Sequence, residues 1–229
     1  MISCPAVEKK TIRYHYDLST PFYRLLWGPH IHHGLWDGDE SPDVAQLRLT
    51  EMLAHRAQLR AGHRVLDVGC GMGGSSIHLA RQGCRVTGVT LSKVQCYWAR
   101  CAAVRAGVRS RVRILRDDAE QLNFPKGSFD IVWTIECTEH FFDKPRFLER
   151  AAAWLPTGGR LAICTWLAGE DQNSERTIQQ VREVCEGFFC PSLASMEEYR
   201  QWLTSAGMVV EWSANLTRQV ERTWEICQS

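Results

Sequence analysis

The sequence predicts an α/β protein: a Rossmann-like three-layer α/β/α sandwich around a mostly parallel sheet. Short apolar runs alternate with longer amphipathic segments, which is the pattern of βαβ units. Several apolar runs are nearly continuous, as in strands buried on both faces. A glycine-rich stretch, VLDVGCGMGGSS at residues 65–76, joins the first such run to a helix. The 229 residues, 45% hydrophobic and 23% charged, are enough for one such domain.

The apolar runs predict six strands in chain order. Their expected ranges are Arg64–Val68, Arg85–Val89, Val112–Leu115, Asp130–Ile135, Arg160–Trp166 and Met208–Trp212. Helices are expected between them, because capping residues and glycines mark their ends. The predicted starts lie at Ser41-Pro42-Asp43, Ser92, Asp143 and the capping box of Ser195 with Glu198. The predicted stops lie at Gly107, the turn 156–159 and Gly207.

Two segments lie outside this alternation and divide the chain into three parts. Residues 1–61 are expected to form an N-terminal helical lid, and residues 62–168 the cofactor-binding core. Residues 169–229 are expected to supply a substrate-side insertion and the C-terminal part of the same domain. Ligands of open α/β sheets bind beyond the carboxyl ends of the strands. We therefore expect the two outer segments to wall that crevice.

The spacing of the glycine-rich loop fits two patterns. Gly69, Gly71 and Gly74 match G-x-G-x-x-G, whereas Gly69, Gly71 and Gly73 match G-x-G-x-G. In either pattern, glycine lets the backbone turn tightly and approach a ligand closely. The residues beside the loop must therefore decide which cofactor it binds.

Acidic residues near the loop favour S-adenosylmethionine over a dinucleotide. Asp67 precedes Gly69 by two residues and places an acid where a cation fits better than a pyrophosphate. Residues 88–95, at the end of the second strand, lack the acid that normally holds the ribose of a nicotinamide cofactor. Asp118, after the third strand, can accept a hydrogen bond from an adenine amino group. S-adenosylmethionine has an adenosine and a sulfonium but no phosphate, which matches this distribution.

These residues also carry a family resemblance. The stretches VLDVGCGMGGSS, GVTLSKVQ, DDAEQLNFPKGSFDIVW and ECTEHFFDKPRFLERAAAWLPTGGRLAI resemble class I S-adenosylmethionine-dependent methyltransferases of small molecules, similar to tocopherol methyltransferases (methyltransferase type 11). The leader YHYDLSTPFYRLLWGPHIHHGLW resembles cyclopropane fatty acid synthases. The resemblance covers roughly residues 14–212. It implies a final antiparallel strand, for which the residues after 216 are too few, so we expect that strand to be missing.

The resemblance implies a cofactor site assembled from several segments. The leader closes over the cofactor, the glycine loop holds its methionine and ribose part, and residues 90–95 hold the ribose. Residues 118–119 meet the adenine, and the residue after the fourth strand lies at the methionine end. The implied contacts are Tyr16, His33, Gly34, Asp67, Gly69, Cys70, Gly71, Thr90, Leu91, Gln95, Asp118, Ala119 and Glu136.

Catalytic candidates follow the fourth strand, in ECTEHFFD at residues 136–143. Methyl transfer needs alignment of acceptor, methyl group and sulfur, and a hydroxyl or amine acceptor also needs a base. We expect His140 or Glu139 to act here, because histidine ordinarily titrates near neutrality. A structural role for His140 at a helix start is an equal alternative. The resemblance to cyclopropane synthases implies bicarbonate binding as another role for Glu139.

Other charged residues are expected to be structural. His30, His32 and His33 lack a carboxylate or cysteine at clear ligand spacing, so no metal site is expected. The net charge of +1, and the lack of aromatic residues within the arginine-rich stretch 105–116, argue against nucleic acid as a partner. No apolar run is long enough for stable membrane insertion. The oligomeric state stays open.

The sequence thus predicts a methyltransferase that converts S-adenosylmethionine to S-adenosylhomocysteine. Its acceptor is expected to be a small, lipophilic or natural-product-like molecule, methylated on oxygen, nitrogen or carbon. Ten cysteines without a secretion signal or a C-x-x-C pattern predict free thiols in the cytoplasm. The alternatives are an NAD(P)-dependent oxidoreductase and a non-catalytic S-adenosylmethionine-binding protein.

Overall fold

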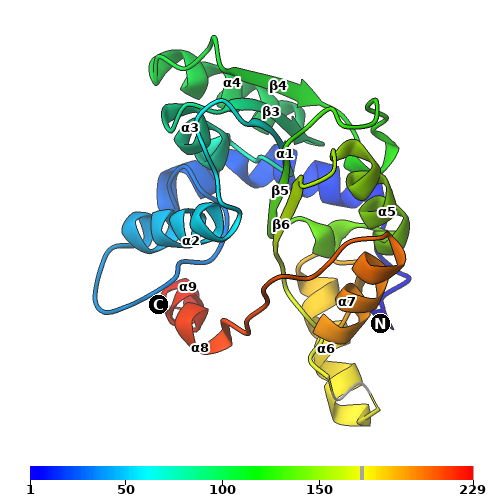
Figure 1. Cartoon of the computed structure of the whole chain (residues 1–229). Helices are drawn as coiled ribbons and strands as arrows, with labels where there is room; N and C mark the ends of the chain where they lie inside the picture. Colours follow the sequence, from blue (N-terminus) through cyan, green and yellow to red (C-terminus); the bar gives the residue numbers. More distant parts are fainter. Residues whose placement is uncertain (171–172, 229) are drawn as a thin grey trace.

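The computed structural model describes residues 1–170 and 173–228 (Figure 1). Its main sheet consists of five parallel strands in the order β4-β3-β2-β5-β6. They are β2 (Arg64–Val68), β3 (Arg85–Thr90), β4 (Val112–Arg116), β5 (Ile131–Ile135) and β6 (Arg160–Cys164). The chain reverses direction across the sheet between β2 and β5, and ligands bind at the carboxyl edge of such a reversal. The predicted α/β fold class is confirmed.

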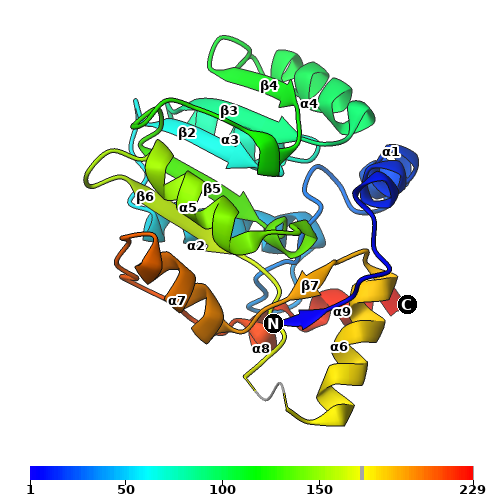
Figure 2. The ribbon, with the colours of Figure 1, turned by 90° about the vertical axis from the view of Figure 1, so that its right-hand side faces the viewer.

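Helices cover both faces of this sheet, because its strands alternate their side chains between two apolar cores. Val65 and Trp133 pack with α2 (Pro42–Arg56), α3 (Gly74–Arg81) and α4 (Lys93–Arg105). Leu66 and Val132 pack with α5 (Lys144–Trp154) and α7 (Met196–Ser205) on the other face. Figure 2 shows α5 in front of the sheet and α2 behind it. This arrangement is the predicted three-layer sandwich.

Most helix ends lie where capping residues predicted them. The side chain of Ser92 accepts a hydrogen bond from the backbone of Gln95, at 3.1 Å, at the start of α4. Ser195 and Glu198 form the predicted capping box of α7. Ser41 does precede α2, but its hydroxyl makes no capping hydrogen bond. There the proline at the first helical position marks the start instead.

One predicted strand is wrong: residues 208–212 do not pair with any strand that the structure describes. A strand needs a neighbour for its backbone N–H and C=O groups, and a wide cavity separates this segment from β6. The segment runs past that cavity, and Val209 is 85% exposed. An ion pair between Arg160 and Glu211 connects β6 with it. β6 itself ends at Cys164, earlier than predicted.

A second, smaller layer joins the two outer segments of the chain. β1 (Ile2–Ser3) pairs antiparallel with β7 (Ser192–Leu193), and both pack with α6 (Glu175–Gly187) around a separate apolar core. The segment predicted to be the lid holds α1 (Lys9–Leu26) and α2. The segment after 168 holds α6, α7, α8 (Thr217–Val220) and α9 (Arg222–Gln228), and its residues 171–172 and 229 lie outside the described residues. No described helix is long and apolar enough to cross a membrane.

Candidate active site

The glycine loop between β2 and α3 uses both of the patterns found in the sequence. Gly69, Gly71 and Gly73 all have positive φ, at 76°, 51° and 86°. A Cβ at Gly69 would lie 2.3 Å from the sulfur of Cys137, whereas one at Gly71 would meet nothing closer than Ile31, at 4.0 Å. Gly69 therefore permits close packing against the end of β5, and Gly71 faces open space.

Gly74 has a different role from the other glycines of the loop. A Cβ there would lie 2.8 Å from the ring of His30 and from the carbonyl oxygen of Pro29. The leader, residues 29–33, therefore approaches the start of α3 at backbone distance. The fourth glycine serves the contact between leader and core, which a dinucleotide pattern would assign to a phosphate.

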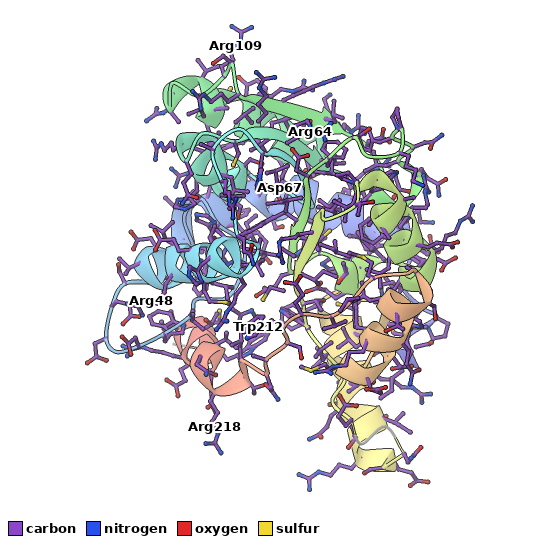
Figure 3. The ribbon with its side chains drawn as sticks, viewed as in Figure 1. Arg48, Arg64, Asp67, Arg109, Trp212 and Arg218 are labelled. Atoms are coloured by element: carbon purple, nitrogen blue, oxygen red, sulfur yellow. The ribbon has the colours of Figure 1, made fainter. Side chains whose placement is uncertain are left out.

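Asp67 is the buried acid of the site. It lies in β2, is 2% exposed, and accepts a hydrogen bond from the Ser76 hydroxyl of α3 at 2.5 Å. Burial raises its pKa to about 6, although the Ser76 hydrogen bonds oppose the shift. Figure 3 shows Asp67 in the interior, well away from the labelled surface arginines.

A cavity opens in front of Asp67, at the carboxyl edge of the sheet. It brings together twelve of the residues singled out in the sequence. They are Tyr16, Asp67, Gly69, Cys70, Gly71, Thr90, Leu91, Gln95, Asp118, Ala119, Glu136 and His140. They come from α1 and from the segments after β2, β3, β4 and β5, which converge because parallel strands end at one edge. We call this space the first cavity.

Three of the expected site residues lie elsewhere. His33 lines a second cavity, described below. Gly34 lines neither cavity, and a Cβ there would lie 2.5 Å from that of Ala45, so it permits the leader to pack on α2. Glu139 is 2% exposed and points away from both cavities' linings.

The sequence reasoning missed several residues that line the first cavity. Lys9, at the start of α1, donates to Asp118 and to Glu120, each at 2.7 Å. His30 and His32 also line it, and a 3.1 Å hydrogen bond joins their rings. Their only sequence signal is membership of the leader, which does not say which way a side chain points. In the described part of the chain no group of three or more His, Cys, Asp or Glu side chains could hold a metal ion.

Glu136 follows β5 and lines both cavities. Its backbone is left-handed, with φ 47°, which is strained for a residue other than glycine. Its Oε1 accepts hydrogen bonds from the backbone N–H and the Nδ1 of His33, both at 2.9 Å. Burial alone would raise the pKa of Glu136, but its contacts with His33 and His32 lower it overall. Glu136 is therefore a buried carboxylate that stays ionised.

His140 has a fixed orientation at the far side of the first cavity. Its Nδ1 lies 3.2 Å from the carbonyl oxygen of Phe189, to which it can only donate. Its Nε2 is then free of a proton and accepts from the Tyr16 hydroxyl, at 2.9 Å. Burial lowers the pKa of His140 to about 4, so the ring is neutral near pH 7.

Glu139 has the opposite character. Its Oε2 accepts from the Thr165 hydroxyl at 3.0 Å, while its Oε1 has no hydrogen-bond partner among the described residues. Burial, together with the nearby charge of Glu136, raises the pKa of Glu139 to about 8. This carboxyl group is therefore mostly protonated near pH 7.

The second cavity is large and mainly apolar, with a volume of about 850 Å³. It lies between β6, α2, α6 and the segment 208–216. At its inner end the rings of His33, Trp166, Phe188 and Trp224 pack edge to face, with neighbouring centroids 4.9–5.5 Å apart. Trp212 lines its outer part, where the Arg56 guanidinium lies 4.5 Å from the ring centroid (Figure 3). Pockets of this size suit ligands of drug-like dimensions.

A parallel sheet with a glycine loop, an acid in its first core strand and acids around the cleft define a class I S-adenosylmethionine-dependent methyltransferase. A family model described as mycolic acid cyclopropane synthetase matches residues 5–228. The chain belongs to this family.

Two relatives and one solved structure agree with this assignment. The 27-O-demethylrifamycin SV methyltransferase of Amycolatopsis mediterranei is 37% identical over 217 residues, 91% of this chain and 77% of the relative. The probable tocopherol O-methyltransferase of rice (Oryza sativa subsp. japonica) is 32% identical over 221 residues, 88% of this chain and 61% of the relative. The geranyl diphosphate C-methyltransferase of Streptomyces coelicolor A3(2), solved with S-adenosyl-L-homocysteine, has the same fold. Its TM-score is 0.82 at 24% identity, covering 98% of this chain and 88% of that one.

The predicted enzyme class, cofactor and small-molecule type of acceptor are therefore confirmed. Nothing in these similarities supports the alternative of an NAD(P)-dependent oxidoreductase. The chain spans 61% of the length of the rice relative, so the particular acceptor is a matter for proposal.

Proposed function

We propose that this chain methylates a hydroxyl group of a lipophilic, natural-product-like acceptor bound in the second cavity, with the cofactor in the first. The observation that carries this proposal is Glu136, which lines both cavities and so marks where they meet. The apolar aromatic end of the second cavity suits a ring-bearing acceptor. The names of the relatives, which refer to 27-O-demethylrifamycin SV and tocopherol, support an oxygen nucleophile.

The charge of the first cavity supports its assignment to the cofactor. Carboxyl groups of Asp67, Asp118, Glu120 and Glu136 line it, and its only lysine, Lys9, is already paired with two of them. Burial lowers the pKa of His30 to about 3 and also lowers that of His32, so these rings add no positive charge near pH 7. Such a cavity favours a cation and disfavours a diphosphate. S-adenosylmethionine supplies a methyl group on a cationic sulfonium.

Residues of several segments would hold the cofactor. Asp67 and the loop at Gly69–Gly71 would hold its methionine part, Thr90 and Gln95 its ribose, and Asp118 its adenine. The Thr90 hydroxyl donates to Gln95 Oε1 at 2.7 Å, which fixes the Gln95 amide. Asp118 has one oxygen on Lys9 and the other on the backbone of Glu120, so an adenine would share these oxygens.

The best-placed base is His140. Neutral and with an unprotonated Nε2, it can take the proton of an acceptor hydroxyl, either directly or through the Tyr16 hydroxyl that already donates to it. The Phe189 carbonyl stabilises the ring proton on Nδ1 throughout. Glu139, protonated and turned away from the cavities, fits a positioning role next to Thr165 better than a role as base.

The test is methyl transfer from labelled S-adenosylmethionine to a panel of hydroxylated polyketides and prenylated phenols. We expect product with at least one such class. Trp224→Ala should raise KM for the acceptor without changing the affinity for S-adenosylhomocysteine, since Trp224 lines only the second cavity. Cofactor binding without transfer to any acceptor would favour the non-catalytic alternative. An unchanged KM in the Trp224 variant would remove the acceptor from this cavity.

Two broader expectations belong to the same proposal. All ten cysteines are free thiols, which supports a reducing compartment such as the cytoplasm, and cell fractionation tests that location. Residues 1–61 would act as a lid over the core at 62–168, with 169–229 supplying the acceptor side. Slower hydrogen exchange in α1 on addition of S-adenosylhomocysteine would support the lid, and unchanged exchange would contradict it.

A further inference from the structure

The outer face of α1 is a continuous apolar stripe. Its members recur at helical spacing along the 18 residues of the helix, about 27 Å. They are Tyr14 (68% exposed), Leu18 (59%), Phe22 (63%), Leu25 (82%) and Leu26 (77%). Few monomeric proteins expose so many large apolar side chains in one row without a partner. We call this row the α1 stripe.

The stripe is not a misplaced core face, because α1 already has one. On the opposite side of the helix Ile12 and Thr20 are buried, and Tyr16 lines the first cavity. Asp17 fixes the rotation of the helix: its carboxylate accepts from the Ser92 hydroxyl at 2.6 Å and from the Val94 backbone at 3.2 Å. Figure 2 shows α1 nearly end-on at the margin of the molecule, beside α4.

Positive charge borders the stripe. With about 100° per residue, Lys10, Arg13 and Arg24 fall on one side of it, and all three are exposed. The acids nearby are already engaged, since Glu8 pairs with Lys10 at 2.6 Å and Asp17 binds α4. The whole chain carries only +1, so this cationic border is local.

The adjoining helix continues the same character. Tyr97 is 67% and Trp98 37% exposed on α4, the helix that α1 packs on, and Lys93 at its start is exposed too. Tyrosine and tryptophan combine an apolar ring with a polar group and favour the boundary between water and lipid. An apolar stripe, aromatic neighbours and a basic border together make an interfacial helix surface.

We propose that the α1 stripe docks flat on an anionic lipid bilayer. A second copy of the chain fits less well: a two-fold contact between antiparallel α1 helices would set Arg24 against Lys10 and Arg13 of the other copy, so like charges would meet. Anionic headgroups complement the basic border instead. Docking would hold the roof of the first cavity at the place where lipophilic acceptors concentrate. The proposal does not depend on which acceptor is methylated.

The test is co-sedimentation of the full chain with vesicles of phosphatidylcholine alone or mixed with phosphatidylglycerol. We expect binding to the mixed vesicles that weakens as sodium chloride is raised. Leu18→Ser with Phe22→Ser should weaken it at least about tenfold, because two large apolar side chains no longer enter the interface. The matched control is Val209→Ser, which removes an equally exposed apolar side chain far along the chain and should leave vesicle binding unchanged.

A charge variant provides an independent measurement. Arg13→Gln with Arg24→Gln should weaken binding to the mixed vesicles about 20-fold, since two basic contacts are lost. Circular dichroism and unchanged affinity for S-adenosylhomocysteine establish that each variant is folded. Equal binding of the serine variant and the unchanged protein would overturn the proposal. So would a concentration-dependent dimer, in sedimentation velocity, that the serine variant abolishes.

Discussion

Buried ionisable side chains give the site its chemistry at the scale of single residues. Burial raises the pKa of Asp67 to about 6 and that of Glu139 to about 8, while it lowers that of His140 to about 4. Glu136, held by His33, shifts in the other direction from the two raised acids. Acids with such different environments can have separate roles at one pH, and clefts that hold them are functional sites.

Asp67 should make cofactor affinity depend on pH. Its pKa is raised from 3.8 to about 6, so the free protein holds a proton that a cationic ligand displaces. Affinity for S-adenosylmethionine should therefore rise with pH up to a plateau above about 6. The stability of the free protein should fall over the same window, because the folded state binds the extra proton. Calorimetric titrations from pH 5 to 8 measure both the affinity and its midpoint.

Two variants identify Asp67 as the source of that dependence. Asp67→Asn should weaken binding and flatten the pH profile. Ser76→Ala removes the hydroxyl that stabilises the ionised carboxylate, so it should move the midpoint upward. A profile in Asp67→Asn that matches the unchanged protein would exclude Asp67 as the titrating group.

His140 should act without an acid limb near neutrality. With a pKa of about 4 it stays unprotonated, so kcat should remain level from pH 8 down to about 5. His140→Gln should lower kcat by about 10²–10⁴ with little effect on cofactor affinity. Single-turnover rates across pH measure this. A limb centred near 6.5, the ordinary value for histidine, would contradict the buried ring seen here.

The clamp between α1 and α4 decides how the roof of the cavity is held, at the scale of elements. Asp17→Ala removes two hydrogen bonds from a carboxylate, each of the kind worth about 1.5–3 kcal/mol. We expect faster hydrogen exchange throughout α1 and weaker cofactor binding, while the exchange of α5 is unchanged. Glu8→Ala is the control, because Glu8 contacts only exposed Lys10. Unchanged exchange in α1 would show that its apolar contacts alone hold it.

Thr223 joins the two ends of the chain at the scale of the whole molecule. Its hydroxyl oxygen accepts from the backbone of Gly34 at 3.1 Å and from Trp36 Nε1 at 2.9 Å, which ties α9 to the leader. Thr223→Val keeps the shape but leaves both donors without that acceptor. The free energy of unfolding should fall by about 1–3 kcal/mol.

Chemical denaturation measures this loss, and Thr223→Ser is the matched variant. Serine keeps the hydroxyl, so it should retain most of the stability and the acceptor KM. In the valine variant KM should rise, because α9 carries Trp224 of the second cavity. Equal stabilities of the valine and serine variants would show that packing, and not the hydrogen bonds, holds α9.

The sequence by itself determined the core of this protein. Strands β2 to β5, the glycine loop and the helix caps depend on local periodicity and backbone conformation, which neighbouring residues set. Twelve site residues follow from these strands, since parallel strands deliver what comes after them to one edge. The enzyme class was also readable, because its motifs lie in these local elements.

Only the tertiary structure decided the rest. It turned Lys9 onto Asp118 and Glu120 and moved the pKa of His140 far from its ordinary value. It also left residues 208–212 unpaired, because their apolar pattern fits a strand but no neighbouring strand lies beside them among the described residues. Partners distant in sequence, burial and the supply of a pairing edge are properties of the whole packed chain. No local pattern contains them, and they set which side chains meet and how acidic each one is.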